Sequence, residues 1–413
     1  MDSLSEEILD HVVSLLKRMV GVRDQPDHQA LLSMSLVSHR LHRITEPHLY
    51  HTLKLQPSNQ FQLLRTAHAR PTLLSHTQNL QLMGEPDQAL SIDILPELRN
   101  FHVLDINVES FRGRTWIPFL HLASITKLFL RNITPSRMNG EDEIEWCFTN
   151  HSIKALCISF AEPNDDPWED CDDIPKLTGC FPNLEYLEIF GSDNGGHKCE
   201  LDGFVFRYLV YAFSSAFQTN LRGFEFWYHC EGILSAYVGM DEVISVVFDA
   251  NNTLHRSKLR KLRLDTNCLL PYSTSDRSGT LTLSILPLSL HKVYLRHVVY
   301  NNNNLTEAGM IEDIYSGEET RCLVHLFEEL AWLSKLPQLT EVMLALFVPE
   351  DYICVAIEVC RKHGGLRDVK FGLVIAPWIN YQLNDIAKSW PEYNKTKDPR
   401  HALFDKERLR GHK

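Results

Sequence analysis

The chain has 413 residues, of which 44% are hydrophobic and 23% charged, and its formal net charge is −12 at pH 7. This length exceeds a comfortable single core, so we expect a soluble, folded protein with two domains or a repeat array. The acidic balance repels phosphate backbones and argues against nucleic acid as the main ligand. No run of about 18 residues lacks charged or strongly polar side chains, and the first residues do not resemble a secretory signal, so we expect no membrane segment and a cytoplasmic or nuclear location.

The first 50 residues predict three short helices. Ser3-Leu4-Ser5-Glu6 fits a capping box, and a second helical run covers residues 31–41. Pro47 is typical of the first turn of a helix and predicts a third one. Apolar residues recur at steps of three and four along the first helix, at Leu4, Ile8, Val12, Leu15/Leu16 and Met19.

So small a unit buries only about 60% of its chain surface. Three interpretations follow for its apolar side chains. The helices could form an ordinary cap on the domain behind them, or a helical hairpin without a partner. They could also present leucines that another protein's helices cover.

The order and spacing of the apolar residues resemble an F-box over about residues 2–53. The matching segments are Leu4-Ser5-Glu6-Glu7-Ile8-Leu9, Val12/Val13, Leu15-Leu16, Leu36-Val37-Ser38-His39-Arg40-Leu41, Ile44 and Leu49-Tyr50. Ser5 stands where the family usually has Pro. The resemblance implies binding to a Skp-family adaptor and, through it, a cullin. The adaptor-binding residues that it implies are Leu4, Ile8, Leu9, Val12, Leu16, Leu36, Val37 and Leu41.

Beyond residue 53 a short pattern of apolar residues, apolar-x-x-apolar-x-apolar, keeps returning. Its copies are Leu98-x-x-Phe101-x-Val103, Ile125-x-x-Leu128-x-Leu130, Ile153-x-x-Leu156-x-Ile158, Leu184-x-x-Leu187-x-Ile189, Leu221-x-x-Phe224-x-Phe226, Leu259-x-x-Leu262-x-Leu264, Leu290-x-x-Val293-x-Leu295, Leu339-x-x-Val342-x-Leu344 and Leu366-x-x-Val369-x-Phe371, after a weaker copy at Thr77, Leu80 and Leu82. The copy at Leu259 continues to Asn267 and Leu269, which completes the leucine-rich-repeat signature. Alternation within each copy predicts a strand with one buried face.

Four of the spacers predict return helices, at residues 204–217, 242–248, 322–336 and 351–363. Strand, helix and strand in succession predict an α/β fold, namely a curved leucine-rich-repeat-like solenoid with a parallel sheet. An ordinary α/β sandwich would instead show continuous apolar strands. We therefore predict a helical domain at 1–53, about ten irregular repeats at 54–390 and a charged, poorly ordered tail at 391–413. The acid-rich segment 162–175 lacks the order of a calcium loop and predicts a solvated loop.

The sequence lacks the common motifs that mark catalytic, phosphate-binding or metal-binding sites. The ten cysteines form no Cys-x-x-Cys, and neither phosphate-binding loops nor hydrolase or metalloprotease motifs occur. The histidines form no four-ligand zinc pattern. We therefore expect a protein that is not an enzyme and that has no metal or cofactor.

A substrate surface is expected on the outward positions of the predicted strands. Phe190 and Trp227 lie in adjacent repeats and predict a binding hot spot, although loops could equally cover them and place them in the core. We expect acidic residues beside this hot spot on the same face and, beyond them, a strip of basic residues. The residues predicted to contact a substrate are Phe190, Trp227, Glu188, Glu225, Arg263, Tyr294 and Arg296.

These patterns and the resemblance lead us to expect an F-box protein with leucine-rich repeats, the substrate receptor of an SCF-type ubiquitin ligase. The receptor would hold a protein substrate on its repeats and the adaptor on its F-box. The alternative is a leucine-rich-repeat scaffold whose helices only cap the solenoid, and an unrecognised hydrolase would need a deep polar pocket.

Overall fold

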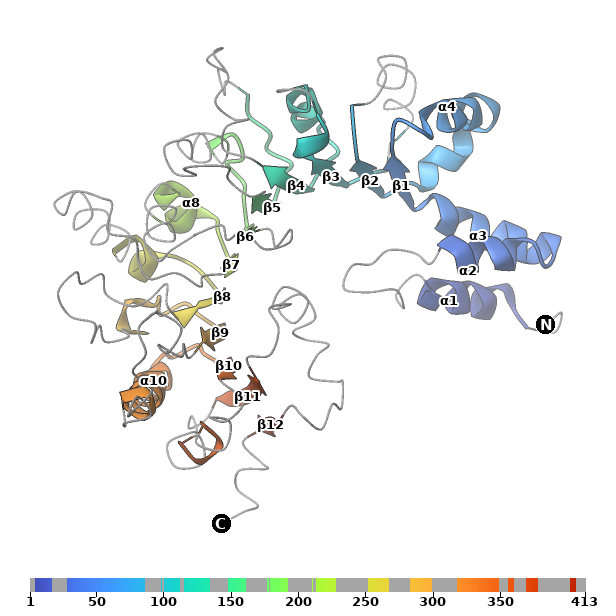
Figure 1. Cartoon of the computed structure of the whole chain (residues 1–413). Coiled ribbons are helices and arrows are strands. Elements are labelled where there is room, and N and C mark those ends of the chain that lie inside the picture. Colours follow the sequence, from blue (N-terminus) through green and yellow to red (C-terminus); the bar gives the residue numbers. More distant parts are fainter. Residues whose placement is uncertain are drawn as a thin grey trace, which may run out of the picture. The chain divides into compact units, whose positions relative to one another are not determined.

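The structure, a computed structural model, describes part of the chain: residues 4–16, 28–85, 98, 100–111, 115–133, 148–160, 177, 179–191, 210, 213–227, 252–266, 283–298, 318–348, 356–359, 369–377 and 402–405. The chain divides into two compact units, Met1–Leu184 (unit 1) and Glu185–Lys413 (unit 2). Both units are α/β, and in each the strands that neighbour each other in sequence also pair in the sheet (Figure 1).

Unit 1 begins with a bundle of α1 (Glu6–Leu16), α2 (His28–Ser35) and α3 (His39–Tyr50). Three helices were predicted, but the third begins earlier than Pro47, which lies inside α3. Ser38 causes the earlier start: its backbone is extended, and its hydroxyl accepts a hydrogen bond from the Leu41 N–H, an N-cap that begins a new helix. Pro47 cannot donate the helical hydrogen bond to the carbonyl four residues before it, so the last turn of α3 forms without that bond.

The rest of unit 1 is a parallel sheet with short helices in the connections. Its elements are β1 (Thr52–Leu55), α4 (Gln60–Ala69), η1 (Pro71–His76), β2 (Asn79–Leu82), β3 (Val103–Asn107), η3 (Val108–Ser110), η4 (Ile117–His121), β4 (Lys127–Ile133) and β5 (Ala155–Phe160). Strands β1 to β5 pair in parallel, each with the next. Alternate residues such as Leu128 and Leu130 are fully buried, as the alternation predicts.

Unit 2 repeats this arrangement. Its elements are β6 (Tyr186–Gly191), α8 (Ser214–Thr219), β7 (Gly223–Trp227), β8 (Lys261–Asp265), η7 (Leu283–Ile285), β9 (Lys292–Val298), α10 (Glu318–Leu333), β10 (Glu341–Val348), β11 (Lys370–Pro377) and β12 (Ala402–Asp405). Strands β6 to β11 pair in parallel, whereas β12 pairs antiparallel to β11. Helices α8 and α10 lie on the same side of these strands (Figure 1).

The strand register differs from the prediction at two repeats. Leu104 pairs with Leu80 and Leu128, so the repeat is Phe101-x-x-Leu104-x-Ile106 instead of the copy that starts at Leu98. Phe371 pairs with Val342, so the last repeat is shifted by two residues, to Phe371 and Leu373 from Val369 and Phe371, on the same face of the strand. Both stretches contain apolar residues in two possible registers, and pairing with the neighbouring strands selects one of them.

The predicted return helices and tail are described in part. Helix α10 matches the segment 322–336, α8 covers the end of 204–217, and residues 356–359 are helical within 351–363. The segments 242–248 and 162–175 lie outside the described residues. Within the stretch predicted as an unstructured tail, Ala402–Asp405 forms β12 along the open edge of β11. An edge strand offers unpaired backbone groups, which explains why the apolar pair Leu403-Phe404 can add there.

Candidate functional site

The candidate site is an exposed apolar surface on the three-helix bundle of unit 1. Helix α1 divides its apolar residues between two faces. Leu9 and Val13 point into the bundle, whereas Leu4, Ile8, Val12 and Leu15 are exposed at steps of three and four along one face. The helix is therefore apolar on the side that packs and also on a side that faces solvent.

The core of the bundle is small. It consists of Leu9, Val13, Leu31, Leu41 and Ile44, with Leu16, Met34 and Leu49 packed against it in part. All three helices contribute, so this cluster holds the bundle together. Leu9 and Val13 occupy the side of α1 that faces this core, so the exposed Ile8, Val12 and Leu15 lie on another face of the helix.

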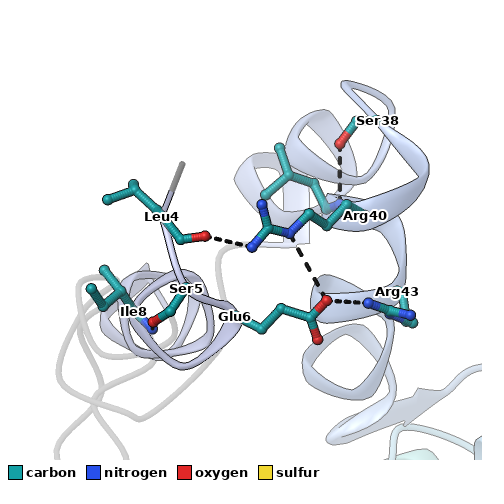
Figure 2. A network of polar contacts seen from close by, with 8 residues as sticks. Leu4, Ser5, Glu6, Ile8, Ser38, Arg40 and Arg43 are labelled. Atoms are coloured by element: carbon teal, nitrogen blue, oxygen red, sulfur yellow. Dashed lines mark hydrogen bonds and ion pairs between the residues drawn. The ribbon is translucent and has the colours of Figure 1, made fainter. Parts of the chain in front are cut away.

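Polar contacts fix the start of α1 against the start of α3 (Figure 2). The Arg40 guanidinium donates to the Leu4 carbonyl at 2.5 Å, and Arg43 pairs with the Glu6 carboxylate. On α1 itself the Ser5 hydroxyl accepts from the Ile8 N–H at 3.4 Å and caps the helix. Ser5 thus caps the start of α1, and the capping by Ser3 that the sequence predicts lies outside the described residues.

The turn between α2 and α3 carries the most exposed apolar side chains of the bundle. Leu36 is 86% exposed and Val37 69% exposed, immediately before the N-cap residue Ser38. Since Arg40 bonds to the Leu4 carbonyl, this turn lies close to the start of α1. We call the exposed apolar set the bundle surface; its members are Leu4, Ile8, Val12, Leu15, Leu32, Leu36 and Val37.

The bundle surface differs from the predicted adaptor-binding set in five residues: Leu9, Leu16 and Leu41 are not part of it, and Leu15 and Leu32 are added. Leu9 and Leu41 are only 4% and 5% exposed and belong to the core. Leu15 and Leu32 are exposed instead and were missed. Each adjoins another leucine, and in a Leu-Leu pair the sequence alone does not tell which member faces the core. Leu4, Ile8, Val12, Leu36 and Val37 are exposed, and Leu16 is half-buried.

Exposed apolar side chains are concentrated in this bundle. Among the residues that the structure describes, the only other large hydrophobic side chains exposed to this degree are Phe61 on α4 and Leu288 in unit 2. Scattered single hydrophobic residues are ordinary on protein surfaces, whereas a cluster marks an interaction site. The bundle surface is therefore the best candidate for protein binding in the described part of the chain.

A second candidate is the polar face of unit 2, which we define as the face of strands β6–β11 opposite their buried leucines. Pairing of the strands lines up its residues in rows. The first row is Tyr186, Gly223, Lys261, Lys292, Glu341 and Lys370. The second row is Glu188, Glu225, Arg263, Tyr294, Met343 and Gly372.

Glu225 is the centre of an ion-pair cluster on this face. Its side chain is 3% exposed and pairs with Arg263 at 3.0 Å and Lys261 at 2.5 Å. Burial by itself raises the pKa of Glu225, but the charges of Arg263 and Lys261, with hydrogen bonds from Lys261 and Tyr186, outweigh it and hold the pKa below its ordinary value of 4.5. The Arg263 guanidinium also lies 5.5 Å from the centre of the Tyr294 ring, within cation–π distance.

Glu341 is the centre of a neighbouring cluster. Its carboxylate pairs with Lys292 at 3.0 Å and with Lys370 at 3.2 Å. Burial raises the pKa of Glu341, but the hydrogen bonds and charges of the two lysines outweigh it, so the pKa is lowered. The hydrogen bond to Glu341 raises the pKa of Lys292, while burial, followed by the Glu341 charge, raises that of Tyr294. The Glu225 and Glu341 carboxylates are therefore both ionised at neutral pH.

These clusters change the predicted substrate-binding set. Glu225, Arg263 and Arg296 lie on the predicted face but are buried, at 2%, 9% and 6% exposed, so they offer almost no contact area. Long side chains on strands about 4.8 Å apart cover one another, which sequence alternation does not reveal. Glu188 and Tyr294 are half-buried. Phe190 and Trp227 are register partners, while their side chains lie outside the described part of the structure.

The described part of the chain shows neither a metal-binding cluster nor a membrane-spanning helix. Among the described residues, no group of three or more His, Cys, Asp or Glu side chains is arranged to hold a metal ion. None of the helices described here combines the length and apolarity needed to cross a membrane. Comparison with protein-family models gave no match, and comparison with curated proteins gave no match either.

Proposed function

We propose that this chain is an F-box protein with leucine-rich-repeat-like strands that serves as the substrate receptor of an SCF-type ubiquitin ligase. The three-helix bundle binds a Skp-family adaptor and, through it, a cullin. The repeat face binds a protein substrate. The observation that carries the proposal is the bundle surface, which leaves the apolar face of α1 and the α2–α3 turn uncovered.

Energetics favour a partner for this surface. Burying an exposed Leu, Ile or Val side chain contributes about 1.5–3 kcal/mol, so covering even a few members of the bundle surface outweighs much of the entropic cost of association. The turn residues Leu36 and Val37 are the most exposed and gain the most from a partner. They are suited to be central anchors of the interface.

A purely capping role needs less apolar surface than the bundle has. The contacts that join the bundle to the strands come from the end of α3: Glu46 pairs with Arg70 at 2.8 Å, and the Tyr50 carbonyl accepts from the Thr77 hydroxyl at 3.0 Å. The bundle surface on α1 and the α2–α3 turn takes no part in these bonds. Capping by α3 is therefore compatible with adaptor binding by the remaining helices.

The proposed mechanism requires no catalytic group on this chain. The adaptor and cullin hold the ubiquitin-transferring machinery near the bundle, while the repeats hold the substrate. Binding both on one scaffold turns a bimolecular encounter into an effectively intramolecular one, with effective concentrations in the millimolar range for short connections.

The test is adaptor capture by the full-length chain. We expect Val37→Asp to reduce capture of a purified Skp-family adaptor by about a hundredfold or more, because a carboxylate would be placed in an apolar interface without a partner. Since Val37 is exposed, folding of the chain should be unaffected. Phe61→Asp is the matched control, because Phe61 is 75% exposed but lies outside the bundle on α4. Equal capture by the parent chain and Val37→Asp would refute the proposal, as would failure of the parent chain to capture any adaptor.

A further inference from the structure

Three lysines form a row across the polar face of unit 2. Lys261 on β8 is in register with Lys292 on β9, which is in register with Glu341 on β10, and Glu341 with Lys370 on β11. Parallel strands lie about 4.8 Å apart, so the row from β8 to β11 extends about 14 Å. We call Lys261, Lys292 and Lys370 the lysine row.

The lysine row carries an excess of positive charge. Together with Arg263 it has four cationic groups, which share the two carboxylates of Glu225 and Glu341, so the cluster has a net charge of +2. Both carboxylates have lowered pKa values and stay ionised at neutral pH. The charge on this patch is opposite to that of the whole chain, which is −12.

Solvent meets the ammonium groups rather than the carboxylates. The side chains of Lys261, Lys292 and Lys370 are 39%, 49% and 76% exposed, whereas those of Glu225 and Glu341 are 3% and 16% exposed. An ammonium group has three N–H donors, so a lysine that donates to one buried carboxylate can still donate to a ligand. The exposed Arg260 precedes Lys261 and adds to the positive charge at this end of the row. The acidic side chains Glu185 and Glu188 lie at the β6 side, away from Lys370.

We propose that the lysine row is a docking site for a carboxylate-rich peptide segment of a partner protein. An extended peptide that crosses the strands places every second side chain on the same side, about 6.6–6.8 Å apart. Acidic residues at positions i, i+2 and i+4 of such a peptide therefore span about 13 Å, which matches the length of the row. Charge complementarity selects the acidic segment, and the strand face offers the ring of the half-buried Tyr294 beside it.

A nucleic acid fits this face less well than an acidic peptide. The net charge of −12 repels a long phosphate chain, and the Glu225 and Glu341 carboxylates lie within the patch itself. A short peptide with spaced carboxylates can contact the three ammonium groups and extend no further. If the acidic peptide is taken to be the substrate of the receptor, this inference rests on the proposed function. Peptide binding by the lysine row does not depend on that function.

The test is fluorescence anisotropy with the full-length chain and a labelled Gly-Glu-Ser-Glu-Ser-Glu-Gly peptide. Matched probes replace each Glu by Gln or by Lys, and a single-stranded oligothymidine of similar length is the nucleic acid probe. We expect binding of the Glu peptide alone, and weaker binding as salt rises from about 0.05 M to about 0.5 M. Equal binding of the Gln peptide, or tighter binding of the oligothymidine, would overturn the proposal.

Variants then locate the site. The double variant Lys292→Gln/Lys370→Gln should weaken binding of the Glu peptide by about five- to twentyfold, since each exposed ion pair contributes about two- to fivefold. Lys335→Gln is the control, because Lys335 is an exposed lysine of unit 2 that follows α10 and lies off the sheet. Glu341→Gln should bind the peptide about twofold or more tightly, because it releases two lysines and keeps the side-chain shape. Unchanged or weaker binding by a folded Glu341→Gln protein would contradict the inference.

The two proposals fail separately. Peptide binding is measured without adaptor, and adaptor capture is measured without peptide. A chain that captures adaptor but does not bind the Glu peptide refutes the lysine-row proposal alone. A chain that binds the Glu peptide but captures no adaptor refutes the proposed function, and the lysine row is then an acidic-peptide site of a protein of another class.

Discussion

Glu225→Gln tests whether the buried ion-pair cluster stabilises the sheet of unit 2. The substitution keeps the side-chain shape but removes the negative charge that Arg263 and Lys261 share. Breaking a fully buried ion pair costs about 3–5 kcal/mol. Lys261 is partly exposed and can be hydrated again, and glutamine still accepts a hydrogen bond, so we expect a loss of about 2–3 kcal/mol, mainly from Arg263.

Hydrogen exchange of the β7 and β8 amides measures this loss locally, which matters because a chain of two units need not unfold in one step. A loss of about 2–3 kcal/mol lowers the protection factors by about 30- to 150-fold. The double variant with Arg263→Gln should lose about 1–2 kcal/mol less than the sum of the single variants, because the two residues share one interaction.

The loss of stability caused by Glu225→Gln should depend on pH in a definite direction. The pKa of Glu225 in the folded chain lies below 4.5, so the carboxylate stabilises the fold above that pH and the stabilisation is lost as the pH falls through the folded-state pKa. The difference between the parent chain and Glu225→Gln should therefore be full at neutral pH and shrink in acid. A protection loss below about threefold, an effect independent of pH, or strict additivity with Arg263→Gln would refute the reasoning.

Two further substitutions test packing, each with a control in the same chain. Leu31→Ala should destabilise the bundle by about 2–5 kcal/mol and abolish hydrogen-exchange protection in α1 and α3, because Leu31 is fully buried. Leu32→Ala, at an exposed position, should change stability by less than about 0.5 kcal/mol. In a thermal-unfolding assay, Gly223→Ala should destabilise unit 2 by about 1–3 kcal/mol, because a Cβ at Gly223 would collide with the Tyr186 ring. Gly179→Ala should be neutral in that assay, since a Cβ there has no neighbour within 4 Å. Equal effects in either pair would contradict these assignments.

The strands were predictable from the sequence because each repeat carries its own signal. Alternation at Leu128 and Leu130 or at Leu262 and Leu264 requires one buried face whatever the neighbours are, and these residues are fully buried. The register was less predictable. The stretch that contains Leu104 admits two alternations, and pairing with β4 decides between them. The stretch that contains Phe371 has one alternation, in which pairing with β10 decides the position of the repeat by two residues.

The predicted helix boundaries were wrong where two local sequence signals compete. Pro47 predicts a helix start, but the Ser38 cap begins α3 earlier and the helix accepts the proline near its end. Likewise, the pairs Leu15-Leu16 and Leu31-Leu32 are equivalent in sequence. The α3 residues that meet the core determine which leucine is buried. Five of the seven members of the bundle surface were in the predicted set, and Leu15 and Leu32 were not.

The sequence alone determined where the buried strand residues lie, that the chain begins with helices too apolar for their size, and that no known catalytic motif is present. Only the tertiary structure decided which leucines remain exposed and which charged residues are buried. Period and composition are properties of single segments, so they can be read from the chain itself. Exposure and ion pairing depend on neighbours such as β7 and β8, which are distant in sequence and about 4.8 Å apart in the sheet. The packing of Glu225 between Lys261 and Arg263 is such a feature, which only the tertiary structure decides.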